Sequence, residues 1–131
     1  MALEKQEHTV TQEDTAVELH SGDLPVLATP RLINWMERTA FAVAKRSIEP
    51  GQTTVGTLVK VEHVKGAPVG TTVTCCSSKP ISDGRRLIFH VTATDEKGDE
   101  IAIGEIQRRV IDPDRFMARF TEAEAAPEAP R

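Results

Sequence analysis

Three side chains of the types used in hydrolysis occur in the first half of the chain: Thr29, Glu37 and His63. A hydroxyl or a carboxylate can attack an ester carbon or position a water molecule, and an imidazole can move the proton. Each residue also has an ordinary structural explanation. Thr29 fits a helix cap, Glu37 a solvated helix flank, and His63 a surface or hydrogen-bonded core histidine. Taken one at a time, these residues establish no site.

One long helix is predicted to carry the first two of these residues. Thr29 precedes Pro30, and a threonine cap followed by proline is a strong start signal, because proline has no N–H to satisfy. Apolar residues then recur at three- and four-residue spacing, at Leu32, Ile33, Met36, Ala40, Val43 and Ala44. With a breaker at residues 49–51, the helix is predicted to run from Pro30 to about Ser47. Glu37 lies about two turns after Thr29, at the edge of the apolar face.

Four segments of strand character follow the helix. They cover residues 53–64, 71–81, 85–95 and 100–111, separated by turn residues such as Ser82-Asp83-Gly84. Because the connections are short, we expect these segments to form an antiparallel meander, with His63 in its first strand. One or two weaker strands are expected within residues 7–19, around Val10 and Val17.

These elements predict an α+β fold in which the helix covers one face of an antiparallel sheet. The open edges and the other face of such a sheet need cover, and homodimerisation is one way to supply it. A single domain is expected over residues 1–120. Residues 121–131, which read TEAEAAPEAPR, have no large apolar side chain to bury and are expected to form a disordered tail.

The composition excludes several classes of function. The 131 residues include 16 Lys and Arg against 20 Asp and Glu, a formal net charge of −4, with both signs interleaved. We expect no nucleic-acid partner, because phosphate binding needs a basic stripe. The absence of a signal peptide or a membrane-spanning run favours a cytoplasmic location, and Cys75 and Cys76 are expected to stay unpaired. No metal-ligand cluster or glycine-rich phosphate loop is present in the sequence.

Several short segments together resemble hotdog-fold acyl-CoA thioesterases, in particular the branch that includes the fluoroacetyl-CoA thioesterases. The resemblance runs from about Val10 to Ile111. Its main segments are Leu24-Pro25-Val26-Leu27-Ala28-Thr29, Met36-Glu37, Val55-Gly56-Thr57, Val61-Glu62-His63 and Pro68-Val69-Gly70-Thr71-Thr72-Val73. It implies a hotdog fold, an antiparallel sheet wrapped around one long central helix. It also implies hydrolysis of an acyl-CoA thioester to the free acid and CoA.

The resemblance also assigns roles to residues. In that branch the active site consists of a threonine at the start of the helix, a glutamate about two turns later and a histidine on the next strand, which match Thr29, Glu37 and His63. Gly56 matches a glycine whose region contacts the thioester carbonyl, and Arg108 an arginine near the site. A homodimer or a dimer of dimers is implied, with sites at the dimer interface and no cofactor beyond the CoA of the substrate. Either Thr29 or Glu37 could be the nucleophile.

The acyl group of the substrate stays open. Fluoroacetyl-specific members carry bulky aromatics before the segment that leads to the threonine, whereas this chain has Gly22-Asp23-Leu24-Pro25 there. A short or medium acyl group or an aryl group is equally expected. A hotdog-fold protein that binds acyl-CoA or a small apolar ligand without catalysis is the alternative. Candidates for contacts with the CoA phosphates, which a solvated strand edge also explains, are Arg85, Arg86, Arg108, Arg109, Arg115 and Arg119.

Overall fold

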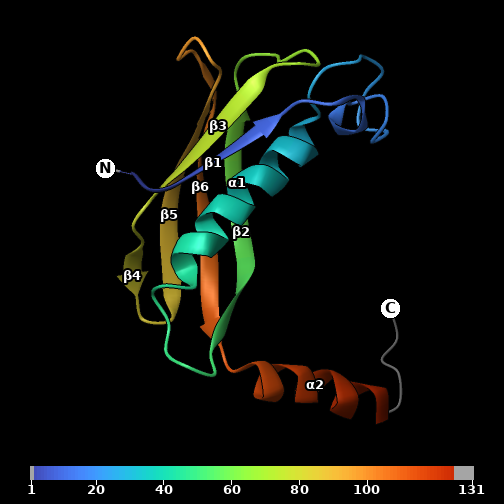
Figure 1. Ribbon diagram of the computed structural model, residues 1–131. Coiled ribbons are helices and arrows are strands. Elements are labelled where there is room, and N and C mark those ends of the chain that lie inside the picture. Colours follow the sequence, from blue (N-terminus) through green and yellow to red (C-terminus); the bar gives the residue numbers. More distant parts are fainter. Residues whose placement is uncertain (1, 126–131) are drawn as a thin grey trace.

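The computed structural model describes residues 2–125, with side chains for residues 2–121, and it confirms the α+β class (Figure 1). Helix α1 (Thr29–Ala44) lies across one face of an antiparallel sheet. The strands of that sheet are β1 (Ala2–Thr9), β2 (Thr53–His63), β3 (Thr72–Ser78), β4 (Ile81–Asp83), β5 (Arg86–Thr94) and β6 (Glu100–Ile111). A 3-10 turn, η1 (Gln12–Asp14), and a second helix, α2 (Pro113–Ala125), complete the described part of the chain.

The strand order in the sheet is β1-β3-β5-β6-β2, with β4 paired to β5. The predicted meander is correct for β3, β5 and β6 but wrong for β2, which pairs with β6 rather than with β3. The connection between β2 and β3 passes the start of α1. There the backbone N–H of Leu27 donates to the carbonyl of Ala67 at 2.8 Å, and Ala67 is buried. This crossing places β2 at an edge of the sheet, opposite β1.

The core lies between α1 and the sheet. The predicted apolar face of α1 is buried except at Ile33, and it packs against β1, β3, β5 and β2. Phe89 and Ile106 belong to the same core on the side of the sheet and are fully buried. Trp35 is also buried, and its ring stacks on that of His8 with centroids 4.5 Å apart, which fixes β1 against the helix.

The ends of several elements differ from the prediction. The N-cap of α1 is Ala28, with an extended backbone, and Thr29 is the first helical residue. The helix ends at Ala44, because Arg46 and Ser47 donate to carbonyls only three residues back, as in a final tight turn. The strand expected around Val17 is wrong, because that segment forms turns, and β1 ends at Thr9, before the buried Val10.

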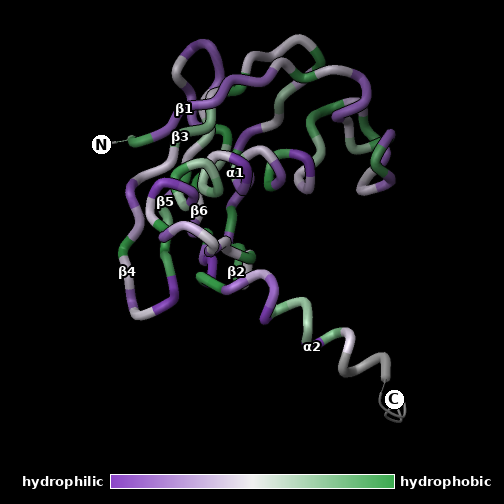
Figure 2. Tube along the Cα trace, turned by 60° about the horizontal axis from the view of Figure 1, so that its bottom comes forward, coloured by the Kyte–Doolittle hydropathy of each residue, from purple (hydrophilic) through white to green (hydrophobic). Residues whose placement is uncertain are grey.

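A helix after residue 111 is not among the predicted elements, yet α2 occupies Pro113–Ala125 and points away from the sheet (Figure 1). Its start carries ordinary signals, because Asp112 accepts the backbone N–H of Arg115 at 3.1 Å and proline follows it. Polar and apolar stretches alternate along it (Figure 2). Residues 121–125 of the expected tail are therefore helical, and residues 126–131 lie outside the described residues.

Two further expectations concern cysteines and membranes. Cys75 and Cys76 are unpaired, as predicted, and burial raises the pKa of the Cys75 thiol to about 12. Within the described residues, neither helix combines the length and the apolar character that crossing a bilayer requires. The cytoplasmic location stays a prediction.

Candidate active site

Thr29 and His63 meet where α1 begins and β2 ends. Their side chains form a hydrogen bond of 2.8 Å between Thr29 Oγ1 and His63 Nδ1. Thr29 is the first helical residue rather than the N-cap, and among the hydrogen bonds of the described residues its hydroxyl bonds to the imidazole and not to the helix backbone. When the histidine proton sits on Nε2, the hydroxyl donates and Nδ1 accepts, which is the geometry of a nucleophile and its general base.

The surroundings of His63 favour its neutral form. Its Nε2 atom is buried and has no hydrogen-bond partner among the described residues. Burial lowers the pKa of His63 from its ordinary value, while the nearby backbone of Lys65 acts in the opposite direction. A histidine whose pKa is lowered is an unprotonated imidazole at neutral pH, and only that form can accept a proton.

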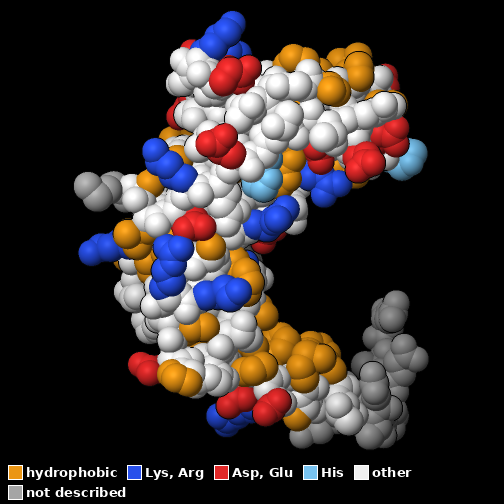
Figure 3. Space-filling view, viewed as in Figure 1, with side chains coloured by type: hydrophobic (Ala, Val, Ile, Leu, Met, Phe, Trp, Pro, Cys, Tyr) orange, Lys and Arg blue, Asp and Glu red, His pale blue; other side chains and the backbone are white. Residues whose placement is uncertain are grey.

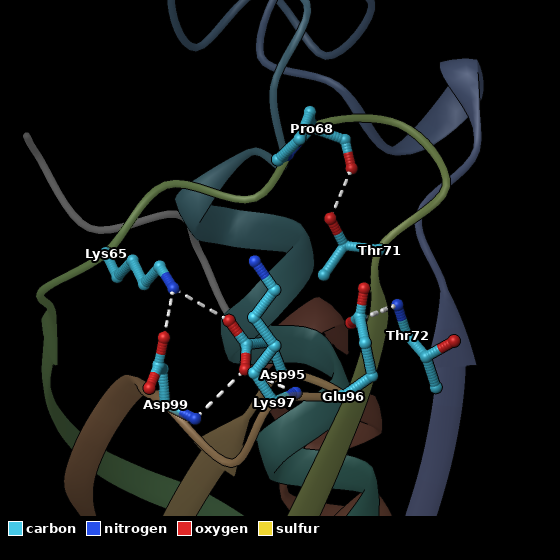
Figure 4. Close-up of polar contacts among 8 residues, drawn as sticks. All are labelled: Lys65, Pro68, Thr71, Thr72, Asp95, Glu96, Lys97 and Asp99. Carbon is cyan, nitrogen blue, oxygen red and sulfur yellow. Dashed lines mark hydrogen bonds and ion pairs between the residues drawn. The ribbon is translucent and has the colours of Figure 1, made fainter.

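The segment that follows His63 is anchored to the turn between β5 and β6 (Figure 4). Lys65 Nζ donates to Asp95 Oδ2 at 2.8 Å and to Asp99 Oδ2 at 2.7 Å. These contacts raise the pKa of Lys65 and lower that of Asp95. The backbone N–H of Val64 also donates to Ile101 at 2.8 Å. The end of β2 is thus held on the sheet, which keeps the imidazole beside Thr29.

A second group of predicted residues lies further along α1 and β2. Glu37 Oε2 is 3.9 Å from Arg108 Nη1. Gly56 lies directly beneath this pair, opposite Arg108 in the β2–β6 ladder. A Cβ atom on Gly56 would be 3.1 Å from Glu37 Oε2 and 3.4 Å from Arg108 Nη1. Glycine is therefore needed at this position because a carboxylate and a guanidinium approach the backbone closely.

Arg108 is held rigidly in this second group. Its Nε donates to Thr54 Oγ1 at 2.8 Å and its Nη2 to the Thr54 carbonyl at 3.1 Å, while the guanidinium lies 5.0 Å from the centroid of the Phe41 ring. Burial lowers the pKa of Arg108 and the Glu37 carboxylate raises it, but an arginine stays charged. Thr54 and Phe41 are not among the residues predicted from the sequence, because contacts from Thr54 to Arg108 require the β2–β6 pairing that the meander prediction excluded.

Within one chain the five predicted residues therefore form two groups rather than one. Thr29 and His63 make the first, and Glu37, Gly56 and Arg108 make the second. About 12 Å of helix rise separates Thr29 from Glu37, and seven residue steps along β2, about 23 Å when extended, lead from Gly56 to His63. No hydrogen bond joins Glu37 to Thr29 or His63 among the described residues. We call the two groups half-sites.

The metal-binding potential of the described residues is limited. No group of three or more His, Cys, Asp or Glu side chains within them is arranged to hold a metal ion. The half-sites themselves offer a hydroxyl, an imidazole, a carboxylate and a fixed guanidinium, which together can activate an oxygen nucleophile and stabilise charge at a carbonyl.

Comparisons with known proteins agree with this chemistry. The family FlK, fluoroacetyl-CoA-specific thioesterase, matches residues 10–114 of this chain. A relative, the fluoroacetyl-CoA thioesterase of Streptantibioticus cattleyicolor, is 35% identical over 94 residues, which make up 72% of this chain and 67% of the relative.

Solved structures support the same assignment. A structure of the fluoroacetyl-CoA thioesterase FlK matches with a TM-score of 0.81 at 29% identity, over 96% of this chain and 93% of that one. A thioesterase superfamily member from Thermus thermophilus matches with a TM-score of 0.84 at 25% identity, over 93% of this chain and 90% of that one. Mutants of FlK have been solved with fluoroacetate and CoA and with acetyl-CoA. The chain therefore belongs to the FlK family of fluoroacetyl-CoA-specific thioesterases, which are thioester hydrolases, and has the hotdog fold that the sequence predicted.

Proposed function

We propose that this protein hydrolyses the CoA thioester of a short or medium acyl group or of an aryl group, with Thr29 and His63 as the reacting pair. The observation that carries the proposal is the 2.8 Å hydrogen bond between the Thr29 hydroxyl and His63 Nδ1. It couples a potential nucleophile to a base that burial keeps unprotonated. Among the groups that the sequence predicted, this pair alone is in contact for proton transfer.

The reaction follows from this contact. His63 Nδ1 takes the proton of Thr29 as Oγ1 attacks the thioester carbon, and the electron pair of the carbonyl moves onto its oxygen. The positive end of α1, where Thr29 is the first residue, stabilises that oxyanion. The thiolate then leaves with the electron pair of the C–S bond and takes the proton from His63. A water molecule, deprotonated by His63, releases the acid from Thr29 in a second, equivalent step.

Glu37 has a different role, because its carboxylate lies beside Arg108 and not beside His63. We place it as the group that orients the attacking water or the thioester, next to the backbone of Gly56. For this it must approach the Thr29–His63 pair of another chain. Residues of two copies therefore complete each site.

The free edge of β2 offers a way to bring the half-sites together. If two copies pair antiparallel along β2 about a two-fold axis between Val59 and Lys60, Gly56 of one copy faces His63 of the other. Each Glu37 then lies beside the second copy's reacting pair. Leu58 and Val59 in the middle of β2 are 42% and 40% exposed, and a hollow runs along the right side of the molecule between its upper end and α2 (Figure 3). A homodimer formed through β2 fits both features.

The residues that precede α1 bear on which acyl group the site accepts. The segment 22–25 carries no aromatic side chain, and Leu24 is 61% exposed, so no aromatic lid covers the start of the helix. Without such a lid we expect no selectivity for a fluoroacetyl group over other small or medium groups.

The test is thiol release from a panel of CoA esters, from acetyl to decanoyl with fluoroacetyl, phenylacetyl and benzoyl added. His63→Ala should lower kcat/KM on the best ester by at least about 10²-fold, because general-base catalysis is lost. His90→Ala, which removes an exposed histidine on β5, is the matched control and should keep wild-type turnover. Equal turnover by wild type and His63→Ala would remove His63 from the mechanism. Tight ester binding without thiol release would make the protein a binder.

A further inference from the structure

A second pocket lies where α2 joins the end of β6. Its volume is about 400 Å³, within the range of small-molecule sites. Four arginines from three parts of the chain line it: Arg85 before β5, Arg109 on β6, and Arg115 and Arg119 on α2. They come together because α2 starts two residues after the end of β6, where Arg85 also lies. The mechanism proposed above uses none of them.

The charge of this arginine pocket is strongly positive. The one carboxylate in its lining is Asp112, which accepts the backbone N–H of Arg115. The ion pairs among the side chains of residues 2–121 include none of the four arginines. Arg86, one residue from Arg85, is by contrast paired with Asp83. Converging guanidinium groups without nearby carboxylates match a ligand that carries several phosphate oxygens.

An aromatic side chain accompanies the arginines. Phe116 lines the pocket, and Phe120 contacts it edge-on, with ring centroids 5.4 Å apart and planes at 65°. Phe120 is 51% exposed, and apolar atoms gather where α2 meets the body (Figure 3). A flat aromatic base can stack on such a surface. The pocket thus combines contacts for phosphates and for a base.

The pocket and the Glu37 half-site share one end of the sheet but use different faces of β6. Arg109 follows Arg108 directly, so about 3 Å of backbone separates the two residues, but successive side chains of a strand point to opposite faces, and Arg108 is buried whereas Arg109 is exposed. A ligand with its phosphates on the arginines therefore needs a flexible arm that passes around the end of the sheet to reach Gly56 and Glu37.

We infer that the arginine pocket binds the phosphorylated adenosine of CoA, with Arg109, Arg115 and Arg119 on its phosphates and Phe116 and Phe120 beside its base. The inference rests on the proposed function, since it assigns the nucleotide half of the same thioester substrate. It gives α2, a helix that is not among the elements predicted from the sequence, a role in substrate binding. Because the contacts are ionic, CoA affinity should fall as salt rises.

The test distinguishes binding of the nucleotide part of CoA from reaction of the thioester. Calorimetry with CoA and with adenosine 3′,5′-bisphosphate compares wild type, Arg115→Gln/Arg119→Gln and the control Arg86→Gln, whose partner is Asp83. The double variant should bind both probes at least about tenfold more weakly, as expected for lost charge-assisted hydrogen bonds. It should also raise KM for the acyl-CoA by a similar factor. Its kcat/KM on the S-acyl-N-acetylcysteamine thioester, which has no phosphate, should stay within about twofold of wild type.

Several outcomes would overturn the inference. Unchanged affinity for both probes would do so, as would an equal loss on the phosphate-free thioester, which would make the arginines part of the fold or of a subunit contact. Size-exclusion chromatography and circular dichroism of each variant identify those structural losses. A wild type that hydrolyses the cysteamine ester but binds neither probe contradicts this pocket alone. A wild type that binds CoA through Arg115 and Arg119 but releases no thiol contradicts the proposed hydrolysis alone.

Discussion

The two half-sites along β2 are built in different ways. At the His63 end, a hydroxyl and an imidazole are in direct contact, and burial lowers the pKa of the imidazole. At the Gly56 end, a carboxylate and a guanidinium stand 3.9 Å apart over a residue without a side chain. Proton transfer needs contact and a neutral acceptor, whereas electrostatic stabilisation needs fixed charges and free space. Each end of β2 meets one of these needs.

The two half-sites are also held in place by different parts of the structure. Thr29 and His63 are end residues of their elements, and the ion pairs of Lys65 with Asp95 and Asp99 hold the chain just beyond His63. Gly56 and Arg108, by contrast, lie within paired strands, and Thr54 holds the guanidinium from the neighbouring strand. The first half-site is fixed by ion pairs of a residue close to it in the sequence, and the second by strand pairing within the sheet.

Mixing two inactive variants tests most directly whether the two half-sites act together across a pair of copies. His63→Ala and Glu37→Gln should each lower kcat by about 10²-fold. After subunit exchange, the mixture should recover about a quarter of wild-type activity. This is because half of the randomly formed dimers are mixed, and one of their two sites then has both Glu37 and His63. The measurement is thiol release before and after exchange.

A second mixture provides the control. His63→Ala with Thr29→Ala should recover nothing, because both changes fall in the same half-site and every mixed dimer keeps one defect in each site. If the Glu37→Gln mixture also stays inactive after exchange is verified by mass, the half-sites do not combine between copies, and Glu37 has no place beside the reacting pair.

A smaller effect is expected when the second half-site is crowded but keeps its charges. Gly56→Ala places a methyl group 3.1 Å from Glu37 Oε2, so the carboxylate must shift by a few tenths of an ångström. We expect kcat to fall about tenfold, since small misplacements of a catalytic group are costly. Gly66→Ala, at a glycine with nothing within 4 Å of the added atom, should leave kcat unchanged. Equal rates for the two variants would show that the position of the carboxylate does not matter.

The sequence was sufficient for the helix that carries Thr29 and Glu37 and for the strands that carry His63 and Arg108, because their apolar periodicity is strong. It was not sufficient for the pairing of β2 with β6, since short connections favour neighbours and only the buried crossing at Ala67 forces another order. The contacts of Thr54 and Phe41 with Arg108 could not be predicted for that reason. The start of α2 at Asp112 and Pro113 was a local signal, whereas its contribution to a pocket depends on contacts across the fold.

The smallest expected effect is a displacement of the pH profile, and it tests whether the half-sites meet. The rate requires neutral His63, so kcat/KM rises with pH through the pKa of that residue. Within one chain burial lowers this pKa, and Glu37 is not among its causes. A carboxylate brought beside His63 by a second copy stabilises the imidazolium and raises the pKa. Glu37→Gln should therefore move the rise to lower pH and leave it below the ordinary histidine value.

The matched control for this displacement is Glu62→Gln, which removes an exposed carboxylate next to His63 in the sequence. On the solvated face of β2 its charge is screened, so the pH profile should stay in place. A profile that moves for Glu62→Gln but not for Glu37→Gln would contradict the composite site. A profile that moves only for Glu37→Gln requires the carboxylate to act on the imidazole. The single chain does not bring these groups together, so the interaction would have to come from a second copy.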